Sequence, residues 1–235
     1  SLMRPPPLTI SPTPSIPAES TPDPLPPRPF TFLAAPNPLL KASPDRLTTA
    51  LTAHADQKPR ERLLLYSLIF ALAPLRCLEI GVRWGGGSRI IHAALSDLRQ
   101  GLLISLDPAP DLEFNWSEIS DRATLLTAPS PQALPQAALL ANGLFDFVFI
   151  DGDHSKRGVL ADLAGIIPFT QPHATVLLHD AFHTPVAQAI DEALLSGSYT
   201  DCGLLANTPN RGVRAETNEP LSYGGVRLLR RTSSP

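Results

Sequence analysis

The sequence predicts an α/β fold built around a mostly parallel sheet with helices on both faces. Three observations support this. From residue 75 onward, short apolar segments alternate with segments of helical periodicity, which is typical of βα units around a parallel sheet. The apolar segments are continuous, as in strands buried on both faces. The last two predicted strands, Tyr199–Ala206 and Gly225–Leu229, have no helix between them, which indicates an antiparallel hairpin at one edge.

Six helices and seven strands are expected. Ser43 and Pro44 suit the N-cap and first turn of the first helix, and Pro74 ends the second helix. The helices are predicted over Asp45–Gln57, Pro59–Ala73, Ser88–Arg99, Pro131–Ala141, Val159–Ile167 and Pro185–Leu195. The strands are predicted over Leu75–Ile80, Leu102–Leu106, Ala123–Leu126, Phe145–Ile150, Thr175–Leu178, Tyr199–Ala206 and Gly225–Leu229.

Proline divides the chain into two regions. Of the 27 prolines, 14 lie before residue 45, and such a segment forms neither a helix nor a central strand. We therefore expect residues 1–44 to be an extended or disordered arm and residues 45–235 to form one α/β domain. The arm is either a flexible tail or a segment that packs on the domain or on a partner subunit, with Phe30, Phe32 and Leu33 as anchors. If the arm packs on a second copy of the chain, the protein is a homodimer.

Charge and hydropathy exclude several classes of partner. The formal net charge is −3, so no basic excess favours nucleic acid or an anionic membrane. The longest apolar run, Leu63–Leu75, is too short to span a bilayer, which takes about 20 residues, and no signal peptide is apparent. Two cysteines do not make a disulfide framework. We therefore expect a protein of the reducing cytoplasm.

A glycine-rich turn follows the first predicted strand. It begins Glu79-Ile80-Gly81 and continues through Gly85-Gly86-Gly87-Ser88 into a helix. Glycines allow a ligand to approach the backbone closely. The spacing lacks the G-x-G-x-x-G pattern of a nicotinamide-binding turn, and no lysine completes a P-loop. The second strand ends at Asp107. Because ligands of open α/β sheets bind at the carboxyl ends of the strands, this edge is the expected binding site.

A second polar cluster is expected at the same edge. Asp151, Asp153 and His154 follow the fourth strand, and His179 and Asp180 follow the fifth. Carboxylates and imidazoles together can hold a divalent cation, which would lower the pKa of a substrate hydroxyl. Without a metal, His154 is a candidate general base, because an unperturbed histidine titrates at about pH 6.5. Asp153 is also a candidate N-cap for the next helix.

These motifs together resemble those of class I S-adenosylmethionine-dependent methyltransferases. Leu78–Gly81 with Gly85–Ser88 resembles their first motif, and Ile104–Asp107 resembles their second. The segment Phe145–Ser155, with its Ile-Asp-Gly-Asp-His-Ser sequence, is similar to that of one subgroup. The subgroup includes small-molecule O-methyltransferases and relatives of the macrocin O-methyltransferase and cephalosporin hydroxylase type. The resemblance covers roughly residues 60–230.

The resemblance implies a Rossmann-like class I methyltransferase fold and O-methylation of a small hydroxylated acceptor. It implies that Asp107 binds the ribose hydroxyls of S-adenosylmethionine. An extra glycine in the first loop leaves open whether Gly85 or Gly86 faces the methionine part of the cofactor. The cofactor-binding residues are then Glu79, Gly81, Gly85, Gly86, Ser88, Asp107 and Asp151.

The resemblance also suggests where catalysis and metal binding occur. In metal-dependent relatives, the aspartate after strand four and two residues after strand five bind Mg²⁺. Asp151, His179 and Asp180 take these positions here, although histidine is an imperfect match. His154, Asp151 and Asp180 are the candidate catalytic residues, with His154 as the base.

Two other functions are compatible with the same residues. A metal-dependent hydrolase or phosphoesterase would use the Asp-Gly-Asp-His and His-Asp cluster, but it leaves the glycine turn and Asp107 unexplained. A protein that binds S-adenosylmethionine without transferring its methyl group would agree with the altered first loop and the proline-rich arm.

Overall fold

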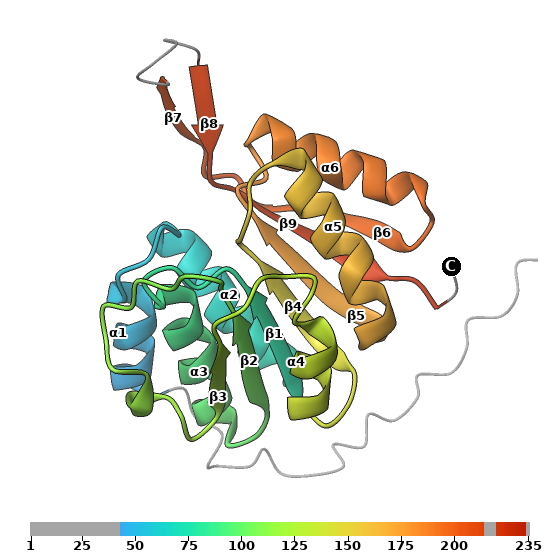
Figure 1. Cartoon of the computed structure of the whole chain (residues 1–235). Coiled ribbons are helices and arrows are strands. Elements are labelled where there is room, and N and C mark those ends of the chain that lie inside the picture. Colours follow the sequence, from blue (N-terminus) through green and yellow to red (C-terminus); the bar gives the residue numbers. More distant parts are fainter. Residues whose placement is uncertain (1–42, 214–219, 234–235) are drawn as a thin grey trace, which may run out of the picture. The chain divides into compact units, whose positions relative to one another are not determined.

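A computed structural model describes residues 43–213 and 220–233, and within them the chain forms a seven-stranded sheet (Figure 1). The strand order is β3-β2-β1-β4-β5-β9-β6. Strands β1 to β5 pair in parallel, and β9 pairs antiparallel with both β5 and β6. The α/β class, the mostly parallel sheet and the antiparallel pair at one edge are confirmed. The predicted arm over residues 1–44 lies outside the described residues, apart from Ser43 and Pro44.

The helices and strands have the following bounds. The α-helices are α1 (Pro44–Thr52), α2 (Pro59–Leu72), α3 (Gly86–Leu98), α4 (Leu134–Leu140), α5 (Lys156–Ile166) and α6 (Thr184–Leu195). The strands of the main sheet are β1 (Arg76–Ile80), β2 (Leu102–Leu106), β3 (Ala123–Leu126), β4 (Phe145–Ile150), β5 (Thr170–His179), β6 (Tyr199–Ala206) and β9 (Val226–Arg231). Two short 3-10 helices span Trp116–Glu118 and Ile167–Phe169.

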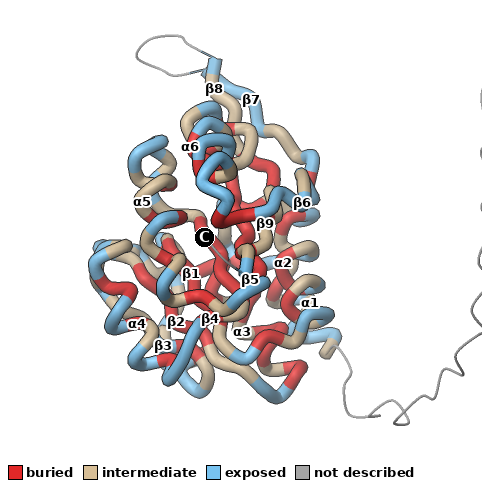
Figure 2. Tube along the Cα trace, turned by 90° about the vertical axis from the view of Figure 1, so that its right-hand side faces the viewer, coloured by how far each residue is buried: buried red, intermediate tan, exposed pale blue. Residues whose placement is uncertain are grey.

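Each face of the sheet is covered by its own hydrophobic cluster. Alternate strand residues point to opposite faces, so that Leu78 and Cys77 belong to different clusters. Helices α4, α5 and α6 pack on the face of Leu78, and α1, α2 and α3 pack on the face of Cys77. The central strands are buried along nearly their whole length (Figure 2). Helices therefore cover both faces, as the continuous apolar strands predicted.

The loop between the last two predicted strands contains a hairpin that the sequence did not predict. Strands β7 (Asn210–Val213) and β8 (Pro220–Tyr223) pair antiparallel and form a sheet of their own. Figure 1 shows the hairpin apart from the main sheet. The strands have no hydrophobic alternation, and β7 is exposed throughout, so the usual signal for a half-buried strand is missing.

Two element boundaries differ from the prediction in ways that affect the site. Helix α1 ends at Thr52, so residues 53–58 form a connection to α2 instead of a last helical turn. The N-cap of α5 is Ser155, whose hydroxyl accepts from the amide of Gly158 at 3.0 Å. Asp153, the predicted cap, instead accepts from the amide and hydroxyl of Ser155.

Within the described residues, no helix is long and apolar enough to cross a membrane.

Candidate active site

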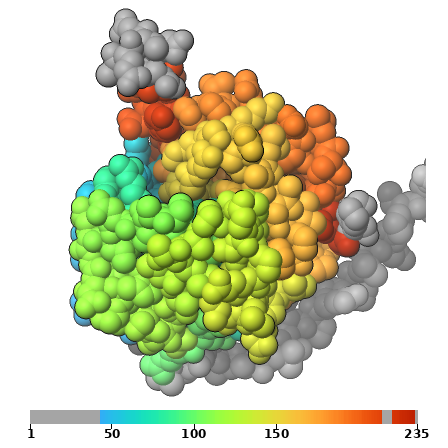
Figure 3. Space-filling view, viewed as in Figure 1, coloured from blue at the N-terminus to red at the C-terminus, as the bar shows by residue number. Residues whose placement is uncertain are grey.

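A cavity of about 790 Å³ lies at the carboxyl ends of β1, β2, β4 and β5. This is the edge at which α/β sheets bind ligands, and the volume is in the range of small-molecule and cofactor sites. Gly81, Gly86 and Asp107 line one part of the cavity, and Asp151 and His154 line another. In the space-filling view, the green segment after β2 adjoins the yellow segment that leads into α5 (Figure 3). The strand-end residues are therefore brought together as expected.

The glycine turn is packed against the end of β4. Gly81 has φ +92°, and a Cβ at this position would lie 2.2 Å from the carbonyl oxygen of Asp151. Only glycine fits such a close approach. Gly86 lines the cavity, whereas Gly85 has φ +85° and lies against the ring of Phe114, outside the lining. Of the two glycines that the sequence left open, Gly86 is the one that faces the cavity.

The carboxylate of Asp107 holds the glycine turn through backbone amides. Its Oδ2 accepts from the amides of Val82 at 2.8 Å and Arg83 at 2.9 Å. Its Oδ1 accepts from the amide of Ala109 at 2.8 Å. Asp107 therefore shapes this part of the cavity, which it also lines.

Glu79 and Ser88 form a buried pair beneath the turn. The hydroxyls of Ser88 and Ser105 donate to Oε2 of Glu79, the latter at 2.7 Å. Burial raises the pKa of Glu79 to about 7, against the effect of these hydrogen bonds. Glu79, a predicted cofactor-binding residue, lines the cavity, and the two serine hydroxyls occupy its Oε2. Ser88 is fully buried and outside the cavity lining, so we retain it only as a residue that shapes the turn.

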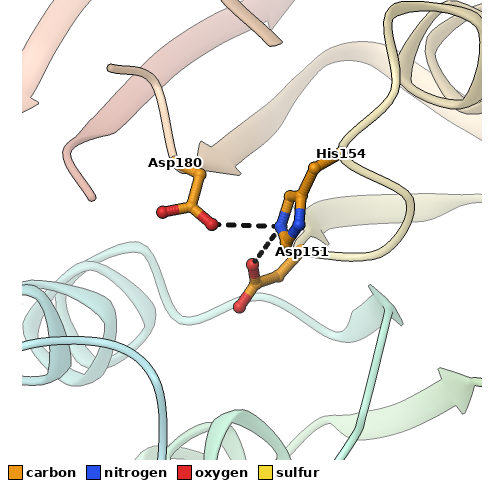
Figure 4. A group of neighbouring side chains, drawn as sticks. All are labelled: Asp151, His154 and Asp180. Atoms are coloured by element: carbon orange, nitrogen blue, oxygen red, sulfur yellow. Dashed lines mark hydrogen bonds and ion pairs between the residues drawn. The ribbon is translucent and has the colours of Figure 1, made fainter. Parts of the chain in front are cut away.

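Asp151, His154 and Asp180 meet at the other part of the cavity (Figure 4). His154 Nε2 lies 3.0 Å from Oδ2 of Asp180 and 3.4 Å from Oδ1 of Asp151. Hydrogen bonds to Asp151 and Asp180 raise the pKa of His154 to about 10, although burial lowers it. His154 is therefore an imidazolium at neutral pH in the ligand-free protein. It becomes a general base only when the negative charge of the two carboxylates is reduced.

Asp180 is held in an unusual backbone conformation. It has φ +54°, a left-handed conformation that aspartate tolerates better than most residues. The amide of Gly224 donates to Oδ1 of Asp180, and the amide of Phe182 donates to the carbonyl of Gly224 at 3.0 Å. Burial raises the pKa of Asp180, but hydrogen bonds from His154 and His179 outweigh it and hold the pKa far below its usual range. The segment that follows β8 thus fixes this carboxylate.

His179 lies behind these residues, with carboxylates at both of its ring nitrogens. Nδ1 lies 3.0 Å from Oδ1 of Asp151, and Nε2 lies 3.1 Å from Oε2 of Glu61 on α2. Burial lowers the pKa of His179, but Asp151, Asp180 and Glu61 hold it well above the usual value. Both nitrogens therefore carry protons.

The predicted metal ligands Asp151, His179 and Asp180 lie close together, with Nδ1 of His179 3.0 Å from Oδ1 of Asp151 and 3.5 Å from Oδ2 of Asp180. Ligand atoms of Asp151, His154 and Asp180 also lie within 4.8 Å of one another. Two carboxylate oxygens and one imidazole nitrogen suit Mg²⁺ or Mn²⁺, and the imidazole shifts the preference toward transition metals. Either set of residues therefore fits a divalent cation, and the ligand set stays a prediction.

Several residues of the site have no signal in the sequence motifs. Glu61 is buried and also accepts from the amides of Lys58 at 2.6 Å and Gly225 at 2.7 Å. Gln57 donates through Nε2 to Oδ2 of Asp151. Glu61 and Gln57 precede β1 in the sequence, so only the folded chain brings them to the ends of β4 and β5. Asp162 of α5, whose pKa burial raises to about 6, also lines the cavity.

The motif-bearing part of the chain also matches a known family. Residues 78–181 match the family model described as "Methyltransferase domain". No curated protein matches the sequence.

The fold is similar to that of several solved methyltransferases. The O-methyltransferase from Bacillus cereus, solved with S-adenosylhomocysteine, is 19% identical over 80% of this chain and 87% of that chain, with a TM-score of 0.56. The O-methyltransferase of tomaymycin synthesis from Streptomyces achromogenes, solved with S-adenosylmethionine, is 19% identical over 81% and 91%, with a TM-score of 0.54. A methyltransferase from Podospora anserina, bound to S-adenosylhomocysteine, is 16% identical over 82% and 90%, with a TM-score of 0.53.

The chain thus has the class I methyltransferase fold. Over residues 78–181 it is similar to a methyltransferase domain family, which agrees with the resemblance of its motifs.

Proposed function

We propose that the protein transfers the methyl group of S-adenosylmethionine to a hydroxyl oxygen of a small acceptor. The observation that carries this proposal is the pairing of two kinds of site in one cavity. The glycine turn and Asp107 line one part, and Asp151, His154 and Asp180 line the other. A methyl donor and a hydroxylated acceptor could therefore lie in contact, and positioning of this kind supplies about 7–11 kcal/mol of a barrier.

Asp107 and the glycine turn form the proposed cofactor part. The carboxylate of Asp107 is already aligned by the amides of Val82 and Arg83, and ribose hydroxyls would donate to the same group. Gly81 and Gly86 line this part of the cavity, and the absence of a Cβ lets the turn pack closely against Asp151 and His54. S-adenosylmethionine supplies an activated methyl group on a sulfonium sulfur.

Asp151, His154 and Asp180, the acid–histidine cluster, form the part of the cavity that we propose for the acceptor. Asp151 and Asp180 would orient the acceptor hydroxyl, with the ring of Tyr223 in the adjoining wall. The rings of Tyr223 and His183 stack with centroids 4.5 Å apart, which fixes that wall. Asp151 and Asp180, with His154 or His179, would hold a divalent cation, which when bound lowers the pKa of the acceptor hydroxyl. The transfer would leave S-adenosylhomocysteine, and the hydroxyl proton would pass to solvent or, where His179 is the ligand, to His154.

The cellular setting is part of the proposal. Cys77 is buried and Cys202 is exposed, and neither is in a disulfide. A reducing cytoplasm agrees with two free thiols.

The test combines binding and transfer. The protein is titrated with S-adenosylmethionine and S-adenosylhomocysteine, and then incubated with methyl-labelled cofactor and a panel of catechols, phenols and aliphatic alcohols. Each reaction is run with Mg²⁺, with Mn²⁺ and with chelator. We expect micromolar binding and cation-stimulated labelling of an acceptor oxygen. Binding without transfer to any acceptor would favour a non-catalytic protein. Phosphoesterase activity with Mn²⁺ and no cofactor binding would contradict the proposal.

A further inference from the structure

We propose that Gln57 binds the ammonium group of the methionine part of S-adenosylmethionine, together with Asp151. This inference rests on the proposed function and adds a cofactor-binding residue that lies outside every strand-end motif. Gln57 lies in the connection between α1 and α2.

The orientation of the Gln57 amide is determined by its neighbour. Nε2 donates to Oδ2 of Asp151, and a carboxylate accepts hydrogen bonds but does not donate them when ionised. Nδ1 of His179 and Nε2 of His154 also lie against this carboxylate, 3.0 Å and 3.4 Å from Oδ1. The NH₂ group of Gln57 must therefore face Asp151, so the remaining polar atom, Oε1, is an acceptor.

This acceptor has no partner. Oε1 of Gln57 is buried and makes no hydrogen bond within the part of the chain that the structure describes. A buried amide oxygen without a donor destabilises the folded protein, and most such atoms in proteins are paired. Gln57 is only 5% exposed, yet it lines the cavity. An N–H donor on a bound ligand would satisfy Oε1.

The connection that carries Gln57 is fixed in place. The guanidinium of Arg62 donates to the carbonyl groups of Gln57 at 2.6 Å and Ala55 at 2.9 Å in this connection, and to that of Leu51 at 3.0 Å near the end of α1. The same connection packs on the start of α3, where a Cβ on Gly86 would lie 2.2 Å from the carbonyl oxygen of His54. Gln57 is thus presented to the cavity by a rigid segment, as a binding residue requires.

The chemistry of the cofactor identifies the donor. S-adenosylmethionine has three donor groups: the adenine amino group, the ribose hydroxyls and the methionine ammonium. With the ribose at Asp107 after β2, the methionine part extends across β1 toward Asp151 after β4, a span of about 10 Å for two strand spacings. The ammonium is the donor at that end. Because Gln57 and Asp151 are in contact, one ammonium group could donate to both Oδ2 of Asp151 and Oε1 of Gln57.

The test compares ligands with and without the group that Gln57 would bind. Wild-type protein, Gln57→Leu and the exposed control Gln136→Leu are titrated calorimetrically with two probes. S-adenosylhomocysteine has the ammonium, and 5′-methylthioadenosine lacks the whole amino-acid part. We expect Gln57→Leu to bind S-adenosylhomocysteine about tenfold more weakly. Its affinity for 5′-methylthioadenosine should be unchanged, and Gln136→Leu should behave as wild type.

Other outcomes separate this inference from the proposed function. Equal losses for both probes, or no loss for either, would overturn the assignment of Gln57 and leave the cofactor site in place. If wild-type protein binds neither probe, the proposed function fails and the assignment fails with it. If Gln57→Leu does not fold, Gln57→Asn, which keeps an amide on a shorter side chain, replaces it. The same selective loss for S-adenosylhomocysteine is then expected, and equal affinities for wild type and variant would contradict the inference.

Discussion

The two parts of the cavity are built in different ways. In the cofactor part, Asp107 is bound by backbone amides of Val82, Arg83 and Ala109. In the acid–histidine part, Asp151 and Asp180 are held by side chains and amides from the connection before α2, from β5 and from the segment after β8. The first part depends mainly on one turn, and the second depends on groups that only the complete fold assembles.

This difference determines what a substitution should do. A change at Asp107 frees three backbone amides that are exposed or partly buried, so water can replace the lost carboxylate. A change in the acid–histidine part leaves neighbouring charges buried without their partners. Removing one member of such a network can destabilise the fold by more than the sum of its pairwise interactions. We therefore expect substitutions at Asp151 to have the largest effects on activity, and substitutions near the glycine turn to have smaller effects.

The largest expected effect is on turnover in Asp151→Asn. This carboxylate contacts His154, His179 and Gln57, and asparagine keeps its shape but removes the charge. We expect the rate of methyl transfer to fall about 100-fold, within the usual range for loss of a group that assists proton transfer. Asp191→Asn, on the exposed side of α6, is the matched control. A rate within about threefold of wild type would remove Asp151 from the catalytic machinery.

The next largest effect is on cofactor affinity in Asp107→Ala. A hydrogen bond to a charged group is worth roughly 1.5–3 kcal/mol, so we expect at least about tenfold weaker binding of S-adenosylhomocysteine. Because the ribose is present in both probes, 5′-methylthioadenosine should lose affinity equally. Unchanged affinity for either probe would mean that the carboxylate serves only to hold Val82 and Arg83.

The same contrast explains how much the sequence could predict. The parallel sheet, the glycine turn and Asp107 follow from continuous strands and short-range spacing, so they could be read directly. His179 was predicted as a metal ligand from the family resemblance, but its pairing with Glu61, distant in sequence, could not be predicted. Hairpin β7–β8 and Gln57 were missed because neither has a periodic pattern or a motif. Long-range pairing of polar groups does not appear in local sequence.

A third prediction concerns pH and His154. Its pKa is raised to about 10 in the folded protein, above the value of the unfolded chain, so the protonated form stabilises the fold. That contribution is complete below about pH 6.5 and disappears as the pH rises through about 10. We expect the free energy of unfolding, measured with urea, to fall more steeply over this range in wild type than in His154→Gln. Parallel pH dependences would show that the two aspartates do not hold the proton on His154.

The smallest effect is expected for Glu79→Gln. Glu79 is buried with a pKa raised to about 7, so its ionisation destabilises the fold as the pH rises from about 4.5 to about 7. The variant should lack this dependence in urea unfolding, and it should bind S-adenosylhomocysteine within about threefold of wild type. A loss of tenfold or more would instead show that Glu79 contacts the cofactor directly.

The central claim is that one cavity holds the methyl donor beside the acid–histidine cluster. Calorimetric titration of the wild-type protein with S-adenosylhomocysteine, with and without Mg²⁺, tests it most directly. We predict one site per chain with micromolar affinity, and an affinity that changes with Mg²⁺ because Asp151 borders both parts of the cavity. Absence of binding under both conditions would contradict the account.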